Sequence, residues 1–102
     1  MYLLGYNIKQ TEIFSKWLHK LKDIKAKVAI LRRIERMRQG NFGDIKALGD
    51  DVSEMRLDIS AGYRVYFTKY QDEIVFLLNG GDKSTQAKDI EKAKEIAKEL
   101  QK

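Results

Sequence analysis

The sequence predicts a single α+β domain over residues 1–102, in which a mostly antiparallel sheet carries a helical hairpin on one face and a C-terminal helix. Two patterns indicate this class. Apolar residues recur at helical spacing near both ends of the chain, and they alternate with polar residues in the segments between. The length of 102 residues, with 43% hydrophobic and 34% charged residues, is typical of one folded domain.

The expected element order is β-α-α-β-β-β-α. Residues 2–8 are expected to form the first strand, because Leu4, Tyr6 and Ile8 alternate with other side chains. Thr11 is a suitable N-cap for a first helix that runs to residue 21. The apolar residues of this helix fall in a single stripe, which indicates that one side packs against the sheet.

Asp23 can cap a second helix over residues 23–39, and Gly40 can end it. Its buried stripe is expected to consist of the apolar residues at spacings of three or four, namely Ile24, Val28, Leu31 and Ile34. Arg32 and Arg36 share a face that this stripe leaves to solvent. So short a connection between the two helices predicts an antiparallel hairpin.

Residues 41–51 contain several glycines and aspartates and are expected to form a loop. Three strands are expected at residues 52–59, 63–70 and 74–78, and the last is continuously apolar, as is typical of a central strand. A final helix is expected over residues 84–100, with Asp82 or Ser84 as its cap.

Alternation divides the strand residues between two faces of the sheet. The face under the hairpin is expected to hold the apolar set Met55, Leu57, Ile59, Tyr63, Val65 and Phe67. Arg56, Arg64 and Tyr66 are then expected to project together from the opposite face. Lys83 follows the central strand beside Gly80 and Gly81, where the backbone can approach a ligand closely.

Composition excludes several kinds of chemistry. The chain has no cysteine, which excludes disulfides, thiol catalysis and cysteine-zinc sites. Its single histidine, His19, excludes a zinc site or a pair of histidines acting as acid and base within one chain. We therefore expect neither a metal nor a cofactor. No apolar run approaches the length of a membrane span, so no membrane association is expected, and the lack of cysteine suits a cytoplasmic protein.

The net charge of +5 is concentrated in one segment. Residues 16–38 contain nine lysines and arginines but only two acids, Asp23 and Glu35, and so carry a net charge of +7. Such a stripe attracts polyanions and favours nucleic-acid binding. The alternative is a solvated helix face, because lysine and arginine are also good helix formers.

The polar residues of the strands indicate phosphate chemistry. Two guanidinium groups, a phenol and an ammonium group that converge on one face can hold phosphates and stack a base. The alternative is structural ion pairing, since Arg56 lies between Glu54 and Asp58 on its own strand. Arg64 has no carboxylate near it in sequence. The phosphate interpretation requires that both guanidinium groups reach solvent without being neutralised by local acids.

Two runs of sequence resemble a known toxin superfamily. These are Arg56-Leu-Asp-Ile-Ser-Ala-Gly-Tyr-Arg-Val-Tyr-Phe67 and Leu77-Leu-Asn-Gly-Gly-Asp-Lys-Ser-Thr-Gln86, preceded by a helix with Phe14, Trp17 and Leu18. Together they resemble the HigB-like "addiction module killer" branch of the RelE/ParE superfamily. The resemblance implies a microbial RNase-like α+β fold and a small basic toxin that is neutralised by its antitoxin.

The resemblance also implies which residues act. Arg64 matches the strand arginine that RelE-like toxins place on the scissile phosphate, and Lys83 falls near the basic residue after the last core strand. Arg56 and Tyr66 are motif residues of this branch. Many RelE-like enzymes have a catalytic tyrosine near the C-terminus, but residues 86–100 contain no aromatic residue. Tyr66 would have to substitute for it, or another group moves the protons.

The activity implied is ribosome-dependent, metal-independent cleavage of mRNA by attack of the ribose 2′-OH, with Arg64, Arg56, Tyr66 and Lys83 as catalytic residues. Lys25, Arg32 and Arg36 would dock on ribosomal RNA. The implied partners are mRNA, the ribosome and a cognate helix-turn-helix antitoxin, with DNA bound only through the antitoxin complex. Two alternatives stay open: a non-catalytic ParE-like toxin that binds DNA gyrase, and a relative that only binds its antitoxin.

Overall fold

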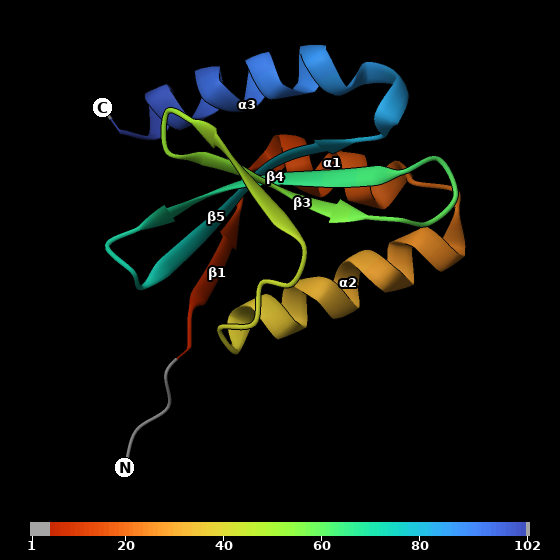
Figure 1. Ribbon diagram of the computed structural model, residues 1–102, viewed down its shortest axis with the longest axis horizontal. Coiled ribbons are helices and arrows are strands. Elements are labelled where there is room, and N and C mark those ends of the chain that lie inside the picture. The colour runs from red at the N-terminus through yellow and green to blue at the C-terminus, as the bar shows by residue number, and fades with distance from the viewer. Residues whose placement is uncertain (1–4, 102) are drawn as a thin grey trace.

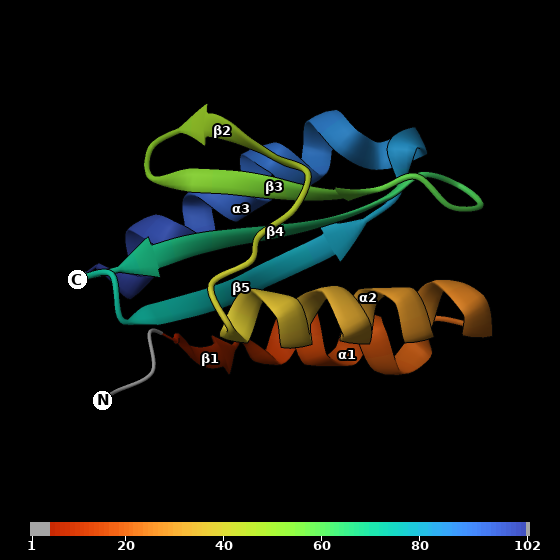
Figure 2. The ribbon, with the colours of Figure 1, turned by 60° about the horizontal axis from the view of Figure 1, so that its bottom comes forward.

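A computed structural model describes residues 5–101 as a five-stranded sheet between two helical layers. The strand order is β1-β5-β4-β3-β2. Strands β1 (Asn7–Gln10) and β5 (Ile74–Gly81) pair in parallel at one edge, and the other neighbouring strands are antiparallel. Helices α1 (Glu12–Lys20) and α2 (Ile24–Arg38) lie on one side of the sheet, and α3 (Gln86–Leu100) lies on the other (Figures 1 and 2).

Local chemistry sets the starts of α1 and α2 where the sequence predicts them, whereas α3 begins at Gln86 after Thr85, which makes no side-chain cap hydrogen bond. The Thr11 side chain accepts a hydrogen bond from the Phe14 backbone N–H, and the Asp23 carboxylate accepts one from the Ala26 N–H. Each cap satisfies a backbone donor that the first helical turn leaves free. Gly40 follows α2 with a positive φ of 89°, a conformation that glycine adopts without steric cost.

The β-rich half contains one strand more than expected. The predicted loop 41–51 includes β2 (Ile45–Gly49), which pairs antiparallel with β3 (Val52–Leu57) and forms the second edge of the sheet. Strand β4 (Tyr63–Tyr70) has its predicted bounds, and β5 extends three residues beyond the prediction. The first strand begins at Asn7, and the first three residues of its predicted range lie outside the described chain.

The core has two parts, one on each side of the sheet. Beneath α1 and α2, the buried residues include Phe14, Ile30, Met55, Val65 and Leu77. Beneath α3, the buried residues are Val52, Tyr66, Leu78, Ala93 and Ala97. The sheet face that was expected to be open is therefore half covered by α3. No helix of residues 5–101 has the length and apolar character that crossing a membrane requires.

Helix α2 buries a different stripe from the predicted one. Ile34 is in the core as expected, but Ile24, Val28 and Leu31 are exposed. The side that packs on the sheet presents Ala26, Ile30, Ile34 and Met37. The helix has two apolar stripes, and the prediction selected the wrong one for three of its four residues.

Candidate functional site

Three of the four predicted catalytic residues line one pocket. Arg56 and Arg64 are directly opposite each other in the register of β3 and β4, and Gly81 is opposite Arg64 on β5. Lys83 begins the short 3-10 helix η1 (Lys83–Thr85) that follows β5. The pocket has a volume of about 220 Å³ and is completed by Asp44, Leu57, Asp58 and Gly62.

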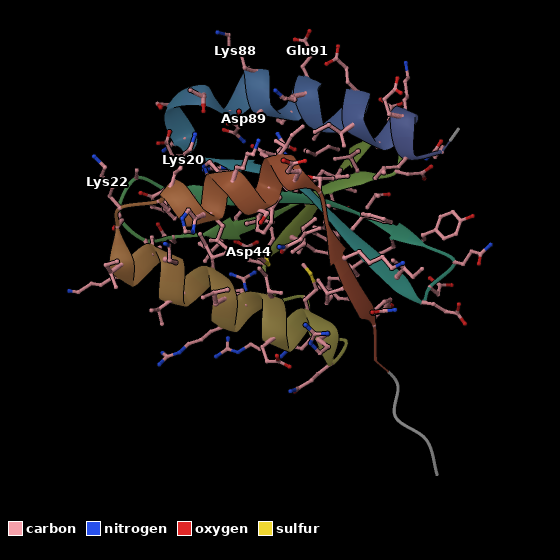
Figure 3. All side chains as sticks on the ribbon, turned by 180° about the vertical axis from the view of Figure 1, so that it is seen from behind. Lys20, Lys22, Asp44, Lys88, Asp89 and Glu91 are labelled. Atoms are coloured by element: carbon pink, nitrogen blue, oxygen red, sulfur yellow. The ribbon has the colours of Figure 1, made fainter. Side chains whose placement is uncertain are left out.

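Arg56 is held by an acid that the sequence did not indicate. Its Nη2 donates to Asp44 Oδ1 at 3.1 Å, whereas the expected partners were Glu54 and Asp58. Asp44 lies just before β2, the strand that was predicted as loop, and Figure 3 shows it between the sheet and α2. The Arg56 side chain is nevertheless 41% exposed, so an exchange of Asp44 for a phosphate needs no unfolding.

Arg33 fixes the backbone of this region. Its guanidinium donates to three carbonyl groups, those of Arg56 at 2.8 Å, Phe42 at 3.2 Å and Asp44 at 3.3 Å. Partial burial lowers the pKa of Arg33 from its ordinary value. The sequence places Arg33 only within the basic stripe, because nothing in it distinguishes Arg33 from its neighbour Arg32.

Arg64 is less accessible than the phosphate interpretation requires. Its side chain is 13% exposed, its Nη1 donates to the Gly62 carbonyl at 2.8 Å, and its Nε lies 3.8 Å from Glu54 Oε1. Glu54 is buried and also accepts a hydrogen bond from Gln86 of α3 at 3.3 Å. Within the described chain, Nη2 of Arg64 has no hydrogen-bond partner and remains available to a ligand.

Glu54 could have been found from the sequence. It alternates to the same face of β3 as Arg56, and in the register of β3 and β4 it is opposite Tyr66, two residues from Arg64. A search confined to residues near Arg64 in sequence misses a partner that comes from the neighbouring strand.

Tyr66 does not project from an open face as predicted. It shares the face of Arg64, but it is fully buried beneath α3 with Val52, Leu78 and Ala93. Its hydroxyl has no hydrogen-bond partner among the described residues. Burial, and secondarily the Glu54 carboxylate, raises the pKa of the phenol above its usual range. The expectation of a solvent-facing phenol is wrong because α3 covers this part of the sheet.

A second hollow adjoins the pocket on the side of α2. It has a volume of about 250 Å³ and is lined by Ala29, Arg32, Arg33, Arg36 and residues 57–59. Leu57 and Asp58 line both hollows, so the two form one continuous surface. Of the predicted RNA-binding residues, Arg32 and Arg36 therefore lie beside the catalytic candidates. Lys25 is exposed nearer the start of α2, roughly 16 Å from Arg36 along the helix axis.

The charges of this surface are unevenly shared. In the first pocket, Arg56, Arg64 and Lys83 are accompanied by Asp44 and Asp58, with the buried Glu54 behind Arg64. These acids offset much of the positive potential. The second hollow adds three arginines and shares Asp58 as its acid. The cationic excess that attracts a polyanion therefore comes from α2. Among residues 5–101, no three histidine, aspartate or glutamate side chains gather as a metal site does.

Comparison with a solved structure shows which known fold this chain shares. The fold is similar to that of one chain in the crystal structure of the intact E. coli RelBE toxin-antitoxin complex, with a TM-score of 0.60 and 21% sequence identity. The likeness covers 76% of this chain and 96% of that chain. The likeness shows that the two chains share an α+β fold, as the sequence predicts.

Sequence comparison specifies the family. Residues 16–102 match the family described as phage derived protein Gp49-like (DUF891), and the chain belongs to this family. An uncharacterized protein of Haemophilus influenzae is 53% identical over 93 residues, which cover 91% of this chain and 94% of that protein. The predicted place in the RelE/ParE superfamily is confirmed.

Proposed function

We propose that this RelE-like toxin is a ribosome-dependent, metal-independent endoribonuclease that cleaves mRNA. The ion pair of Arg56 with Asp44 and the near burial of Arg64 beside Glu54 do not meet the requirement that both guanidinium groups be free. One other observation supports the proposal. Arg56 and Arg64 are paired across β3 and β4, and both line a single pocket together with Lys83. A pocket with three cations from three elements suits a phosphate that bridges two nucleotides.

The chemistry needs few groups. The ribose 2′-OH attacks the adjacent phosphorus, the bond to the 5′-oxygen of the next nucleotide breaks, and a 2′,3′-cyclic phosphate remains. Arg56 and Arg64 would stabilise the charge that develops on the phosphate oxygens, an effect that typically changes rates by about 10²–10³ per donor. Because the Tyr66 hydroxyl is buried, we assign the general base and the general acid to exposed groups of the pocket. Asp58 can accept the 2′-OH proton and Lys83 can donate one to the leaving oxygen.

The proposed partners follow from the same surface. Arg32 and Arg36 border the pocket and would hold ribosomal RNA phosphates beside the mRNA, with Lys25 as a more distant contact. The arginines of α2 would then supply positive potential beside the pocket, where Asp44 and Asp58 offset the charge of its own cations. We further propose a cytoplasmic location and a cognate helix-turn-helix antitoxin, with DNA contacted only through the antitoxin complex.

An in vitro translation reaction followed by primer extension tests this function. Cleavage products should appear within codons on translated mRNA. Arg56→Ala should reduce them by about 10² or more. Intact mRNA together with undiminished translation would contradict the proposal.

A second function is favoured by the acids beside the two arginines. Asp44 neutralises Arg56, Glu54 lies behind Arg64, and Tyr66 is enclosed, so a toxin that works by binding alone fits these contacts as well. Such a toxin would resemble the ParE group, with DNA gyrase as its target, or would bind only its antitoxin. Damage to supercoiled DNA in a gyrase reaction, with mRNA left intact, would support the gyrase alternative.

A further inference from the structure

Arg33 joins three segments that border the proposed cleavage pocket. Its Nη1 donates to the carbonyl of Arg56 at 2.8 Å, and its Nη2 donates to the carbonyls of Phe42 and Asp44 at 3.2 and 3.3 Å. Helix α2 thereby holds both β3 and the segment that leads into β2. One guanidinium can serve carbonyls that lie in different directions, because its donors spread in a fixed, planar fork. Arg33 therefore fixes the relative positions of these segments.

The two pocket residues that Arg33 holds are also bonded to each other. The Arg56 backbone N–H donates to the Asp44 carbonyl at 3.0 Å, and Arg56 Nη2 pairs with Asp44 Oδ1 at 3.1 Å. Because Arg33 binds the carbonyls of both residues, the three residues form a closed set of contacts between the sheet and α2, where Figure 3 shows Asp44. Within residues 5–101, Asp44 is the one carboxylate at ion-pair distance from Arg56.

The ion pair of Arg56 with Asp44 would be weak without this support. The two side chains are 41% and 59% exposed, and exposed pairs gain little because two mobile side chains must be held together. The segment before β2 also contains Gly43, whose positive φ of 67° reflects the backbone freedom of glycine. By fixing the Asp44 main chain, Arg33 removes part of the entropic cost of placing the carboxylate beside Arg56.

We propose that Arg33 is a positioning residue that keeps Asp44 paired with Arg56, so that an RNA phosphate must displace Asp44 before Arg56 can hold it. The proposal rests on the proposed function, since it concerns how RNA reaches Arg56, and it does not require Arg33 to touch the substrate. A short RNA without other contacts competes poorly with Asp44. An RNA that is already held beside the pocket by Arg32 and Arg36 competes at a raised local concentration.

Arg33→Lys tests the proposal, because it keeps the positive charge and removes the guanidinium fork. At low salt, this variant should bind a single-stranded oligouridylate several-fold more tightly than the unmodified chain does. The substitution should have no further effect in an Asp44→Asn background, because the side chain that Arg33 positions is then uncharged. Equal gains with and without Asp44→Asn would overturn the proposal, and so would an affinity that does not rise.

A second readout needs no RNA and separates this proposal from the nuclease. The Nε–H of Arg56 is buried, which protects its proton from exchange, and its resonance in isotope-labelled protein reports whether the guanidinium is paired. Arg33→Lys should move this resonance toward its position in Asp44→Asn. If it moves but no RNA is bound or cleaved, the proposed function fails and the positioning of Asp44 stands. An unmoved resonance with a lower free energy of unfolding would show that Arg33 only supports the fold.

Arg38→Lys is the matched control, because Arg38 lies on the same helix, is 49% exposed and pairs with Glu35. It should change neither the RNA affinity nor the Arg56 resonance, and a response equal to that of Arg33→Lys would contradict the proposal. If Arg33→Lys fails to fold, Gly43→Ala replaces it. A Cβ at this position would lie 3.0 Å from Nη2 of Arg33 and displace it from the neighbouring carbonyls. Gly43→Ala should raise the RNA affinity in the same way.

Discussion

Arg56 and Arg64 face each other across β3 and β4, and each guanidinium has an acid beside it from a different element. Asp44 holds Arg56 at the surface, and Glu54 lies behind Arg64 in the interior. Two like charges directly opposite in a sheet repel each other, and these acids offset that repulsion. The same acids compete with any phosphate that enters the pocket. Stability and binding are therefore coupled at these residues, and substitutions can separate the two.

Arg64→Ala should destabilise the protein as well as inactivate it. The change leaves the buried Glu54 carboxylate with Gln86 as its remaining polar partner, at a cost of about 1–3 kcal/mol in the free energy of unfolding. The double variant Arg64→Ala with Glu54→Gln should regain most of this stability and remain unable to arrest growth. Urea unfolding and growth assays measure the two effects. Growth arrest by the double variant would show that Arg64 has no part in toxicity.

Asp44→Asn should strengthen RNA binding. The change frees Arg56 from its ion pair and removes one negative charge from the pocket. We expect affinity for a single-stranded RNA to rise several-fold at low salt and the gain to shrink as salt increases. Asp50→Asn is the matched control, because Asp50 is equally exposed and pairs with Lys94 of α3 instead. Equal effects of the two substitutions in a filter-binding assay would mean that only net charge matters.

Tyr66→Phe should leave growth arrest intact, because the hydroxyl it removes is enclosed and has no described partner. The free energy of unfolding should be unchanged or should rise by up to about 1 kcal/mol. A variant that no longer arrests growth, while folding normally, would restore Tyr66 to the catalytic machinery.

Tyr66→Phe should also change how the free energy of unfolding depends on pH in alkaline solution. Burial raises the pKa of Tyr66 above that of an unfolded tyrosine, which titrates near pH 10. The unfolded chain therefore loses this proton first, and stability that is complete below about pH 10 declines as pH rises above it. Burial also raises the pKa of Tyr63, so Tyr66→Phe should flatten the decline without abolishing it. Denaturant titrations from neutral to alkaline pH provide the measurement.

Gly80→Ala should destabilise the fold by overpacking. A Cβ at this position would clash with the ring of Trp17 from α1. Enforced repacking of this kind costs about 1–3 kcal/mol. Trp17→Leu should lower stability by itself but should absorb part of the cost of Gly80→Ala. Additive effects of the two substitutions in thermal unfolding would contradict direct contact.

Features set by neighbouring residues could be predicted from the sequence. The caps at Thr11 and Asp23 and the glycine after α2 depend on side chains within a few residues, and they have their predicted places. The face of β4 that carries Arg64 and Tyr66 also followed from alternation. The sequence could not predict that α3 covers Tyr66 and leaves Arg56 partly exposed. The exposure of these two side chains depends on where α3, which is distant in sequence, packs on the sheet.

The errors have the same origin. Strand β2 is short, ends in glycine and lies at the sheet edge, so within residues 5–101 it pairs with β3 alone. In α2, both Ile24-Val28-Leu31 and Ala26-Ile30-Met37 have helical spacing, and the second set is buried only because the sheet lies on that side. Asp44 and Glu54 reach the two arginines through pairing across elements. Patterns within one segment cannot report such contacts.

The parallel pairing of β1 with β5 has a consequence for how the molecule is made. The Thr11 hydroxyl donates to the Leu78 carbonyl, which is 67 residues further along the chain, so β1 has no sheet to join until β5 has been synthesised. Contacts of such long range slow folding. A polypeptide whose synthesis stops before β5 lacks the strand with which β1 pairs, and it also lacks Lys83. Translation products that end before β5 would consequently lack a complete pocket.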